Sequence, residues 1–272
     1  MVIAMKKKIL HQPTFLIGMI ITWIMLLLTV VGFFYTPYDP TQMDTSSKLA
    51  GCSFEHIMGC DNFGRDIFSR VLQGMGNTFL IASATVAIGV VCGVLLGAFT
   101  GYFGGWIDEV IMRIIDVIFA FPSILLALVF VSIFGTGKYN VVFALGIAFV
   151  PSFARIVRSE FIKCKDMDYV KTARLAGVSD LRIMFVHILP NTMTVLLSSI
   201  MIGFNNAVLS EAGMSYLGIG VQPPDASLGK MLSDAQGYLG SAPWYALAPG
   251  LSIVWIVLGF SLLGEGIRRQ SE

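Results

Sequence analysis

The stretch NTFLIASATVAIGVVCGVLLGAFTG, residues 77–101, decides the fold class of this chain. It contains no charged residue, and at about 1.5 Å of rise per residue about 20 apolar residues cross the hydrocarbon core of a bilayer. We therefore predict a transmembrane helix here. Glycine recurs at every fourth position, which places these residues on one helix face and predicts close helix packing rather than a ligand site. The positions are Gly89, Gly93, Gly97, Gly101 and Gly105.

Further stretches of the chain are apolar and long enough to cross a bilayer, and they predict an all-α membrane protein with six transmembrane helices in contact with membrane lipid. The composition agrees, since 56% of the residues are hydrophobic and 13% are charged. A net charge of +1 gives no reason to expect nucleic acid as a partner. The span at 139–159 is the weakest, because Arg155 and Arg158 must snorkel to its cytoplasmic end. The other predicted spans are 15–35, 111–134, 191–211 and 244–264.

The basic residues predict which side of the membrane each segment occupies. With both termini in the cytoplasm, most of the 18 Lys and Arg residues fall in cytoplasmic segments, among them Lys6, Lys7 and Lys8, as the positive-inside rule requires. The apolar run after these lysines is too long for a signal peptide and is expected to stay as an anchor. The expected map is a cytoplasmic N-terminus (1–14), a first span (15–35), an extracytoplasmic segment (36–76), a transmembrane core (77–264) with a cytoplasmic loop (160–190) and an extracytoplasmic loop (212–243), and a cytoplasmic C-terminus (265–272).

The predicted cytoplasmic loop reads as helix, turn, helix. Asp166 or Asp168 can cap the first helix, and Gly177 can end it by adopting a left-handed conformation. Pro190 suits the first turn of the following span. The loop is therefore expected to present a short helix to the cytosol. From the residues alone, this helix either docks on a partner or lies on the anionic inner leaflet.

This loop resembles the EAA loop of binding-protein-dependent importer permeases, in which a short helix docks in a groove of an ATP-hydrolysing subunit. Ala173, Gly177, Leu189 and Pro190 match the pattern in register, whereas Lys171, Thr172 and His187 depart from it. The resemblance implies that residues 169–177 couple the chain to the ATPase. These residues are Tyr169, Val170, Lys171, Thr172, Ala173, Arg174, Leu175, Ala176 and Gly177.

Three other blocks resemble the second membrane subunit of dipeptide, oligopeptide and nickel ABC importers, which are type I importer permeases: residues 58–70, 101–122 and 215–224. The resemblance implies a multi-pass permease of the bacterial plasma membrane that imports di- or oligopeptides. Nickel or a metal chelate is the alternative solute. The implied partners are a second homologous permease, two ATP-binding subunits that hold ATP and Mg²⁺, and an extracytoplasmic solute-binding protein. The chain itself is expected to bind no cofactor and to catalyse no reaction.

Polar residues at the outer end of the fifth span are candidates for the translocation path or gate. Glu211 is expected near the outer interface, where it either lines the path with Asn205 and Asn206 or anchors the following loop by hydrogen bonds. The loop 215–224 is rich in glycine and proline and is expected to fold over the outer mouth. Tyr216 and Gln222 belong to this candidate gate.

Two clusters of charged residues are expected to fix local structure. Glu109, Arg113 and Asp116 stand at helical spacing and can pair on one face at the inner interface, as structural ion pairs or as a moving part of an inner gate. Outside the membrane, Arg65 can pair with Asp61 or Asp66 and hold the loop that receives a binding protein.

Cys52, His56 and Cys60 have a spacing that would bring soft metal ligands together on a helix. A disulfide between Cys52 and Cys60, or no shared role, is the alternative. The sequence contains no phosphate-binding loop and no metalloprotease or serine-hydrolase motif. An ion channel or a scaffold is thus the remaining class beside the importer permease.

Overall fold

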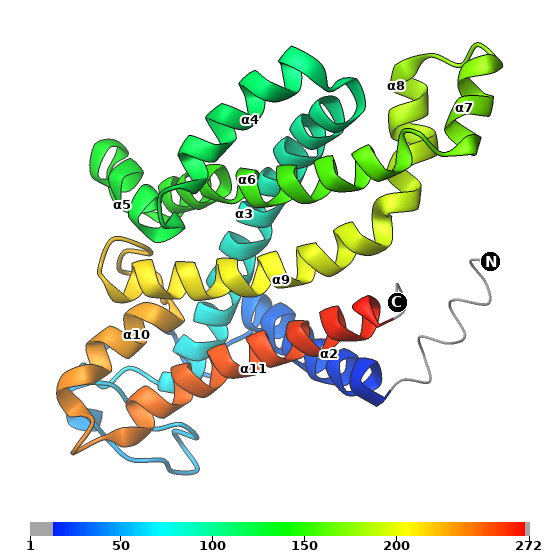
Figure 1. Cartoon of the computed structure of the whole chain (residues 1–272). Helices are drawn as coiled ribbons and strands as arrows, with labels where there is room; N and C mark the ends of the chain where they lie inside the picture. Colours follow the sequence, from blue (N-terminus) through cyan, green and yellow to red (C-terminus); the bar gives the residue numbers. More distant parts are fainter. Residues whose placement is uncertain (1–12, 270–272) are drawn as a thin grey trace.

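The computed structural model describes residues 13–269 and shows a helical protein (Figure 1). The predicted N-terminal lysines and residues 270–272 lie outside the described residues. Five helices are long and apolar enough to cross a membrane, or up to six if one bent helix pair is counted as a span. The longest helices are α2 (Pro13–Phe34), α3 (Ile67–Phe103), α6 (Lys138–Cys164), α9 (Leu189–Tyr216) and α11 (Pro243–Arg268).

The third predicted span, 111–134, is not one straight helix. It belongs to two helices, α4 (Gly105–Phe119) and α5 (Ser123–Phe134), which are bent by 86° relative to one another. Pro122 precedes α5 with φ −54° and ψ 130°, outside the helical region. Proline disfavours helical backbone in the residue before it and cannot donate a helical hydrogen bond, so the chain turns here.

Helix α3 begins well before the predicted span, because Asp66 caps it by accepting hydrogen bonds from the backbone N–H and the hydroxyl of Ser69, both at 2.7 Å. Its glycine face packs on α6, as predicted. A Cβ added at Gly93 would lie 2.5 Å from Phe153 Cβ, and one added at Gly101 would lie 2.7 Å from Phe161 Cβ. Gly105 does not share this face, since it begins α4.

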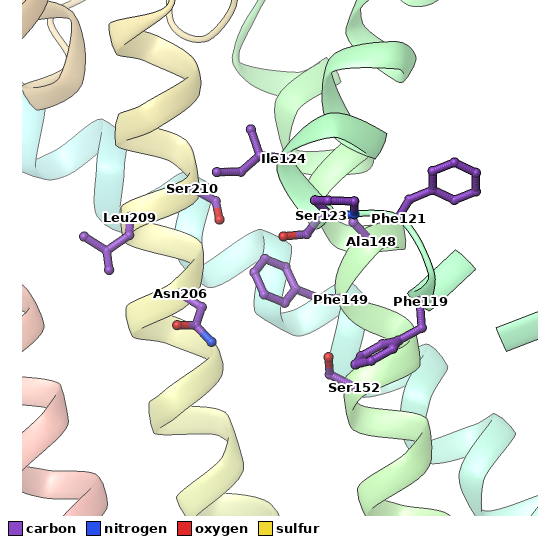
Figure 2. A pocket seen from close by; sticks show the side chains of 11 residues that line it. Phe119, Phe121, Ser123, Ile124, Ala148, Phe149, Ser152, Asn206, Leu209 and Ser210 are labelled. Carbon is purple, nitrogen blue, oxygen red and sulfur yellow. The ribbon is translucent and has the colours of Figure 1, made fainter. Parts of the chain in front are cut away.

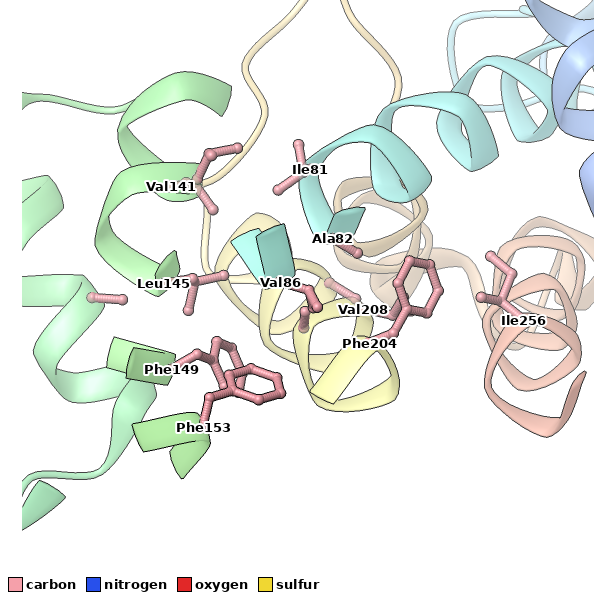
Figure 3. Close-up of a cluster of buried hydrophobic side chains, with 14 of the residues drawn as sticks. Ile81, Ala82, Val86, Val141, Leu145, Phe149, Phe153, Phe204, Val208 and Ile256 are labelled. Carbon is pink, nitrogen blue, oxygen red and sulfur yellow. The ribbon is translucent and has the colours of Figure 1, made fainter. Parts of the chain in front are cut away.

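The core lies where α3, α6, α9 and α11 meet. Figure 3 shows Val86 of α3 near Phe149 and Phe153 of α6. On α9, Phe204 stacks on Phe260 of α11 with ring centroids 4.0 Å apart. These large buried side chains fix the positions of the helices that carry the candidate site.

The short helices lie at opposite ends of the bundle (Figure 1). One end carries α7 (Asp168–Leu175) and α8 (Asp180–Arg182), and the other carries α10 (Leu228–Ala235) with the 3₁₀ turns η1 (Thr45–Ser47) and η3 (Gln236–Tyr238). A π-helical segment, η2 (Ile183–Ile188), joins α8 to α9. The helical stretch Asp180–Tyr216 therefore runs from the α7 end to the α10 end.

Candidate coupling and translocation site

Helix α7 stands out from the bundle as the predicted coupling helix. Gly177 ends it with φ +76°, in the left-handed region that favours glycine. Val170 anchors the helix in the core, whereas Leu175 is 90% exposed. Neither Asp166 nor Asp168 caps α7: the cap position is held by Met167, which makes no side-chain capping bond. Asp168 instead lies in the first turn, where its charge favours the helix dipole.

Tyr102, near the end of α3, connects the two helices of the predicted loop. Its hydroxyl donates to Asp180 Oδ1 at 2.5 Å and accepts a hydrogen bond from Arg174 Nη2 at 3.1 Å. The guanidinium of Arg174 also lies 5.7 Å from the centre of the Tyr102 ring. Because Arg174 belongs to α7 and Asp180 begins α8, one side chain joins three helices.

Ion pairs tie α4 to α6. Arg158 forms a two-point contact with Asp108 at 2.5 and 2.6 Å. Arg155 pairs with Asp116 at 2.7 Å and lies 3.9 Å from the centre of the Phe119 ring. Both arginines thus find partners on a neighbouring helix.

The expected cluster on α4 is only partly formed. Glu109 and Arg113 are paired at 2.6 Å on an exposed face. The expected pair of Arg113 with Asp116 is wrong, since Asp116 faces α6 and is bonded to Arg155. The packing of α4 on α6 decides this partner.

Glu211 lies inside the bundle and is 0% exposed. Its carboxylate accepts hydrogen bonds from the hydroxyls of Thr78 at 2.7 Å, Ser215 at 2.7 Å and Ser227 at 3.0 Å. These donors come from α3, from α9 and from the loop before α10. This geometry is that of a loop anchor, the alternative role, and not that of a path residue exposed to solute.

The other gate candidates lie at the end of α9 and in the loop between α9 and α10. The Gln222 side chain donates to the carbonyls of Gly218 and Gly220, both at 3.1 Å, and so holds the turn of its own loop. Tyr216, the last residue of α9, is exposed. Lys138 at the start of α6 pairs with Asp225 at 2.9 Å and fixes the loop against the bundle.

A half-open cavity of about 450 Å³ lies where the α4–α5 break meets α6 and α9 (Figure 2). Asn206 lines it and also borders two neighbouring cavities of about 110 and 490 Å³, the second of which Asn205 lines as well. Asn205 and Asn206 therefore both line open space in the chain, and their role in a translocation path stays a prediction. The cavity is lined by Phe119, Phe121, Pro122, Ser123, Ile124, Ala148, Phe149, Ser152, Asn206, Leu209 and Ser210.

The segment between α2 and α3, expected outside the membrane, is a loop at Cys52, His56 and Cys60, so the helical spacing assumed for a metal site does not apply. Cys60 is buried, Cys52 is exposed, and His56 Nδ1 lies 2.9 Å from Asp66 Oδ1. Across residues 13–269 no group of three or more metal-ligating side chains comes together. All four cysteines are free thiols, so the expected alternative of a Cys52–Cys60 disulfide is not formed.

A buried ion pair holds this loop, as expected from the sequence. Asp61 accepts a hydrogen bond from Arg65 Nε at 2.7 Å and also lies 3.5 Å from Arg70 Nε. Arg70 in turn donates to the carbonyl of Pro40 at 2.9 Å. Of the two carboxylates proposed for Arg65, Asp61 is the partner, and Asp66 serves as the cap of α3.

Sequence reasoning missed Tyr102 and the serines of the cavity. A tyrosine at the end of an apolar span is common at a membrane interface and gives no hint of its partners. Ser123 and Ser152 are single polar residues among apolar neighbours, and Ser210 is directly followed by Glu211. Only the packing of α5, α6 and α9 shows that they face one cavity.

Known proteins match most of the chain. Residues 93–271 match a family described as binding-protein-dependent transport system inner membrane component. A dipeptide transport system permease protein of Alkalihalophilus pseudofirmus is 38% identical over 262 residues, which cover 96% of this chain and 86% of that protein. A glutathione transport system permease protein of Salmonella typhimurium is 44% identical over 245 residues, 90% of this chain and 81% of that protein.

The fold is also found among solved structures. The MetNI methionine ABC transporter, in an inward-facing conformation, matches with a TM-score of 0.62 at 17% sequence identity. The match covers 74% of this chain and 96% of that chain. At this identity the likeness concerns the fold alone.

Proposed function

This chain belongs to the binding-protein-dependent transport system inner membrane components, and from that premise we propose that it imports short peptides across the bacterial plasma membrane. It is a multi-pass permease subunit of an ABC importer, and ATP hydrolysis is carried out by separate subunits. The proposal further assigns the solute, the partner subunits, and the residues for coupling and for the translocation path.

The solute is a di- or oligopeptide, and glutathione, itself a tripeptide, falls within this class. The observation that carries this choice is the lining of the cavity at the α4–α5 break, which offers hydroxyl, amide and aromatic groups and no charged side chain. Nickel would require nitrogen, sulfur or carboxylate ligands gathered in one place. The named relatives transport dipeptides and glutathione, which agrees with a peptide solute.

Helix α7 is the coupling element, and residues 169–177 form the surface that meets an ATPase subunit. Its exposed residues include Leu175, which at 90% exposure gives an apolar anchor for a groove. Two residues fix the C-terminal end of α7. Arg174 bonds to the Tyr102 hydroxyl, and Gly177 ends the helix in the left-handed conformation. The end of α7 must be rigid, because a flexible connection would not pass the movement of the ATPase subunit on to the membrane helices.

We assign each end of the helix bundle to one side of the membrane. Helix α7 and the C-terminal end of α11 belong to the cytoplasmic end (Figure 1). The loop 36–66, held by Asp61 and Arg65, and the loop before α10, anchored by Glu211, belong to the opposite end. These two loops form the surface that receives the solute-binding protein. A second permease completes the path beside Asn205 and Asn206.

The test is transport by the assembled complex in proteoliposomes. The tagged chain is purified with its co-expressed second permease and ATPase subunits, and uptake of trialanine, glutathione and Ni²⁺ is measured with the cognate binding protein. ATP-dependent uptake of a peptide supports the proposal. Uptake of Ni²⁺ without uptake of either peptide would overturn the peptide assignment, and solute flux without ATP would favour a channel.

A further inference from the structure

The cavity at the α4–α5 break gathers polar groups that have no partner in the part of the chain that the structure describes. Ser123, Ser152, Asn206 and Ser210 all line it (Figure 2). Within residues 13–269, none of these four side chains makes a hydrogen bond to another group of the protein. Ser210 is only 7% exposed, and it lines the cavity without a hydrogen-bond partner among the described residues. Unpaired polar groups are costly inside a membrane, and such a set is retained where a ligand or water bonds to it.

The N-terminus of α5 opens on the same cavity, because Pro122, Ser123 and Ile124 line it. The first N–H groups of a helix have no acceptor in their own helix, and they carry the positive end of the helix dipole. Pro122 makes no side-chain capping bond to them. An anionic group of a solute is therefore favoured at this point, and a metal cation is disfavoured.

The remaining lining fits the body of a peptide. Serine hydroxyls both donate and accept hydrogen bonds, and the Asn206 side chain offers one carbonyl and one amide, so together they match peptide N–H and C=O groups. Phe119 and Phe149 add aromatic faces on which apolar side chains can pack. The cavity is half open, which leaves room for the ammonium end of a peptide beyond its edge.

From these contacts we propose that the cavity is a binding site for a short peptide in transit, with its carboxylate at the N-terminus of α5 and its amide groups on Ser152, Asn206 and Ser210. This inference rests on the proposed peptide function and extends it to the membrane interior. It assigns part of the solute selectivity to this chain rather than to the binding protein alone.

Direct contact is tested by photocrosslinking in the assembled complex. The photoreactive residue p-benzoylphenylalanine replaces Phe149, which lines the cavity, or Phe143, an exposed residue on α6 that does not. During ATP-driven uptake of radiolabelled trialanine, labelling from position 149 is expected to exceed that from position 143 at least tenfold. Equal labelling from both positions would overturn the site.

The role of the α5 N-terminus is tested with Ser123→Pro. Proline is tolerated in the first turn of a helix and removes the N–H, and Pro122 already has the extended backbone that a following proline requires. Ser123→Ala is the matched control, since it removes only the hydroxyl. Wild type is expected to take up trialanine roughly tenfold faster than trialanine amide. Ser123→Ala is expected to lower the uptake of both solutes and keep this ratio, because its N–H remains, whereas Ser123→Pro is expected to lose the ratio. A preference unchanged in Ser123→Pro would contradict the carboxylate assignment.

The amide contacts are tested with Asn206→Leu, which is expected to lower trialanine uptake roughly tenfold while ATP hydrolysis continues. The control is Ser252→Ala, because the Ser252 hydroxyl bonds to the Ala248 carbonyl of its own helix at 2.7 Å. Uptake by Asn206→Leu equal to that of Ser252→Ala would overturn the amide contacts. If wild type takes up no peptide at all, the proposed function fails; if it takes up trialanine without labelling from position 149, only the site fails.

Discussion

The hydroxyl of Tyr102 lies 2.5 Å from the carboxylate of Asp180, and this single contact joins the end of α3 to the beginning of the helical stretch that becomes α9. At the other end of the same helices, Thr78 of α3 bonds to Glu211 of α9 at 2.7 Å. Helices α3 and α9 are thus tied near both ends. Helix α7 is bonded to Tyr102 through Arg174, so we expect a displacement of α7 to move both helices together.

Tyr102→Phe is expected to weaken the coupling of ATP hydrolysis to transport, because it removes the hydroxyl that joins Arg174 to Asp180. One hydrogen bond to a charged group contributes about 1.5–3 kcal/mol, so the bonded arrangement of α7 becomes roughly ten- to a hundredfold less favoured. The number of ATP molecules hydrolysed per peptide taken up should rise. Tyr139→Phe, at an exposed tyrosine on α6, is the control and should leave this ratio unchanged. A wild-type ratio in Tyr102→Phe would exclude Tyr102 from coupling.

Leu175→Asp is expected to weaken binding of the ATPase subunits. The side chain is 90% exposed in the isolated chain, and a buried apolar anchor of an interface typically contributes about 2 kcal/mol or more. Less ATPase subunit should therefore co-purify with the tagged permease. Leu239→Asp changes an exposed leucine near α10 in the same way and should have no effect. Equal recovery of the ATPase from both variants would argue that α7 lies on the lipid surface instead.

Glu211 is expected to stabilise the loop before α10, and its variants should differ in how much they lower the free energy of unfolding. Glu211→Gln keeps the shape and one acceptor oxygen, and the hydroxyl of Thr78 can rotate to accept from the new amide, so a loss of about 1 kcal/mol is expected. Glu211→Leu leaves three buried hydroxyls without an acceptor and should cost about 3 kcal/mol or more. Thermal unfolding of the purified complex measures both. A leucine variant as stable as wild type would rule out the anchor.

Hydropathy was sufficient to predict most spans, because five long helices carry apolar windows of 18 residues with at most two charged residues. It could not predict the break at Pro122, since an apolar run reads the same whether the helix is straight or bent by 86°. Proline is also tolerated inside other helices of this chain, at Pro151 of α6 and Pro249 of α11. The break therefore depends on tertiary packing as well as on the residue.

Ion pairs between residues of different helices could likewise not be predicted from the sequence. Spacing along one helix correctly paired Glu109 with Arg113, because both lie on the same face. It failed for Asp116, whose partner Arg155 is 39 residues away. The glycine face of α3 was predictable for the opposite reason: small residues at a four-residue period need only a neighbouring helix, and not a particular one.

The state of the outer cysteines can be measured with a maleimide under non-reducing conditions. Cys52 is exposed and should react readily at pH 7.5, whereas Cys60 is 0% exposed, and burial followed by the nearby Asp66 raises its pKa to about 11. Only the thiolate reacts, so Cys60 should stay unlabelled until the protein is unfolded. Because the folded pKa lies above the unfolded value, this thiol stabilises the fold below about pH 9 and that contribution is lost as the pH rises toward 11. If both cysteines remain unlabelled after unfolding and react only after reduction, a Cys52–Cys60 disulfide forms in the protein and the free-thiol arrangement of this loop is wrong.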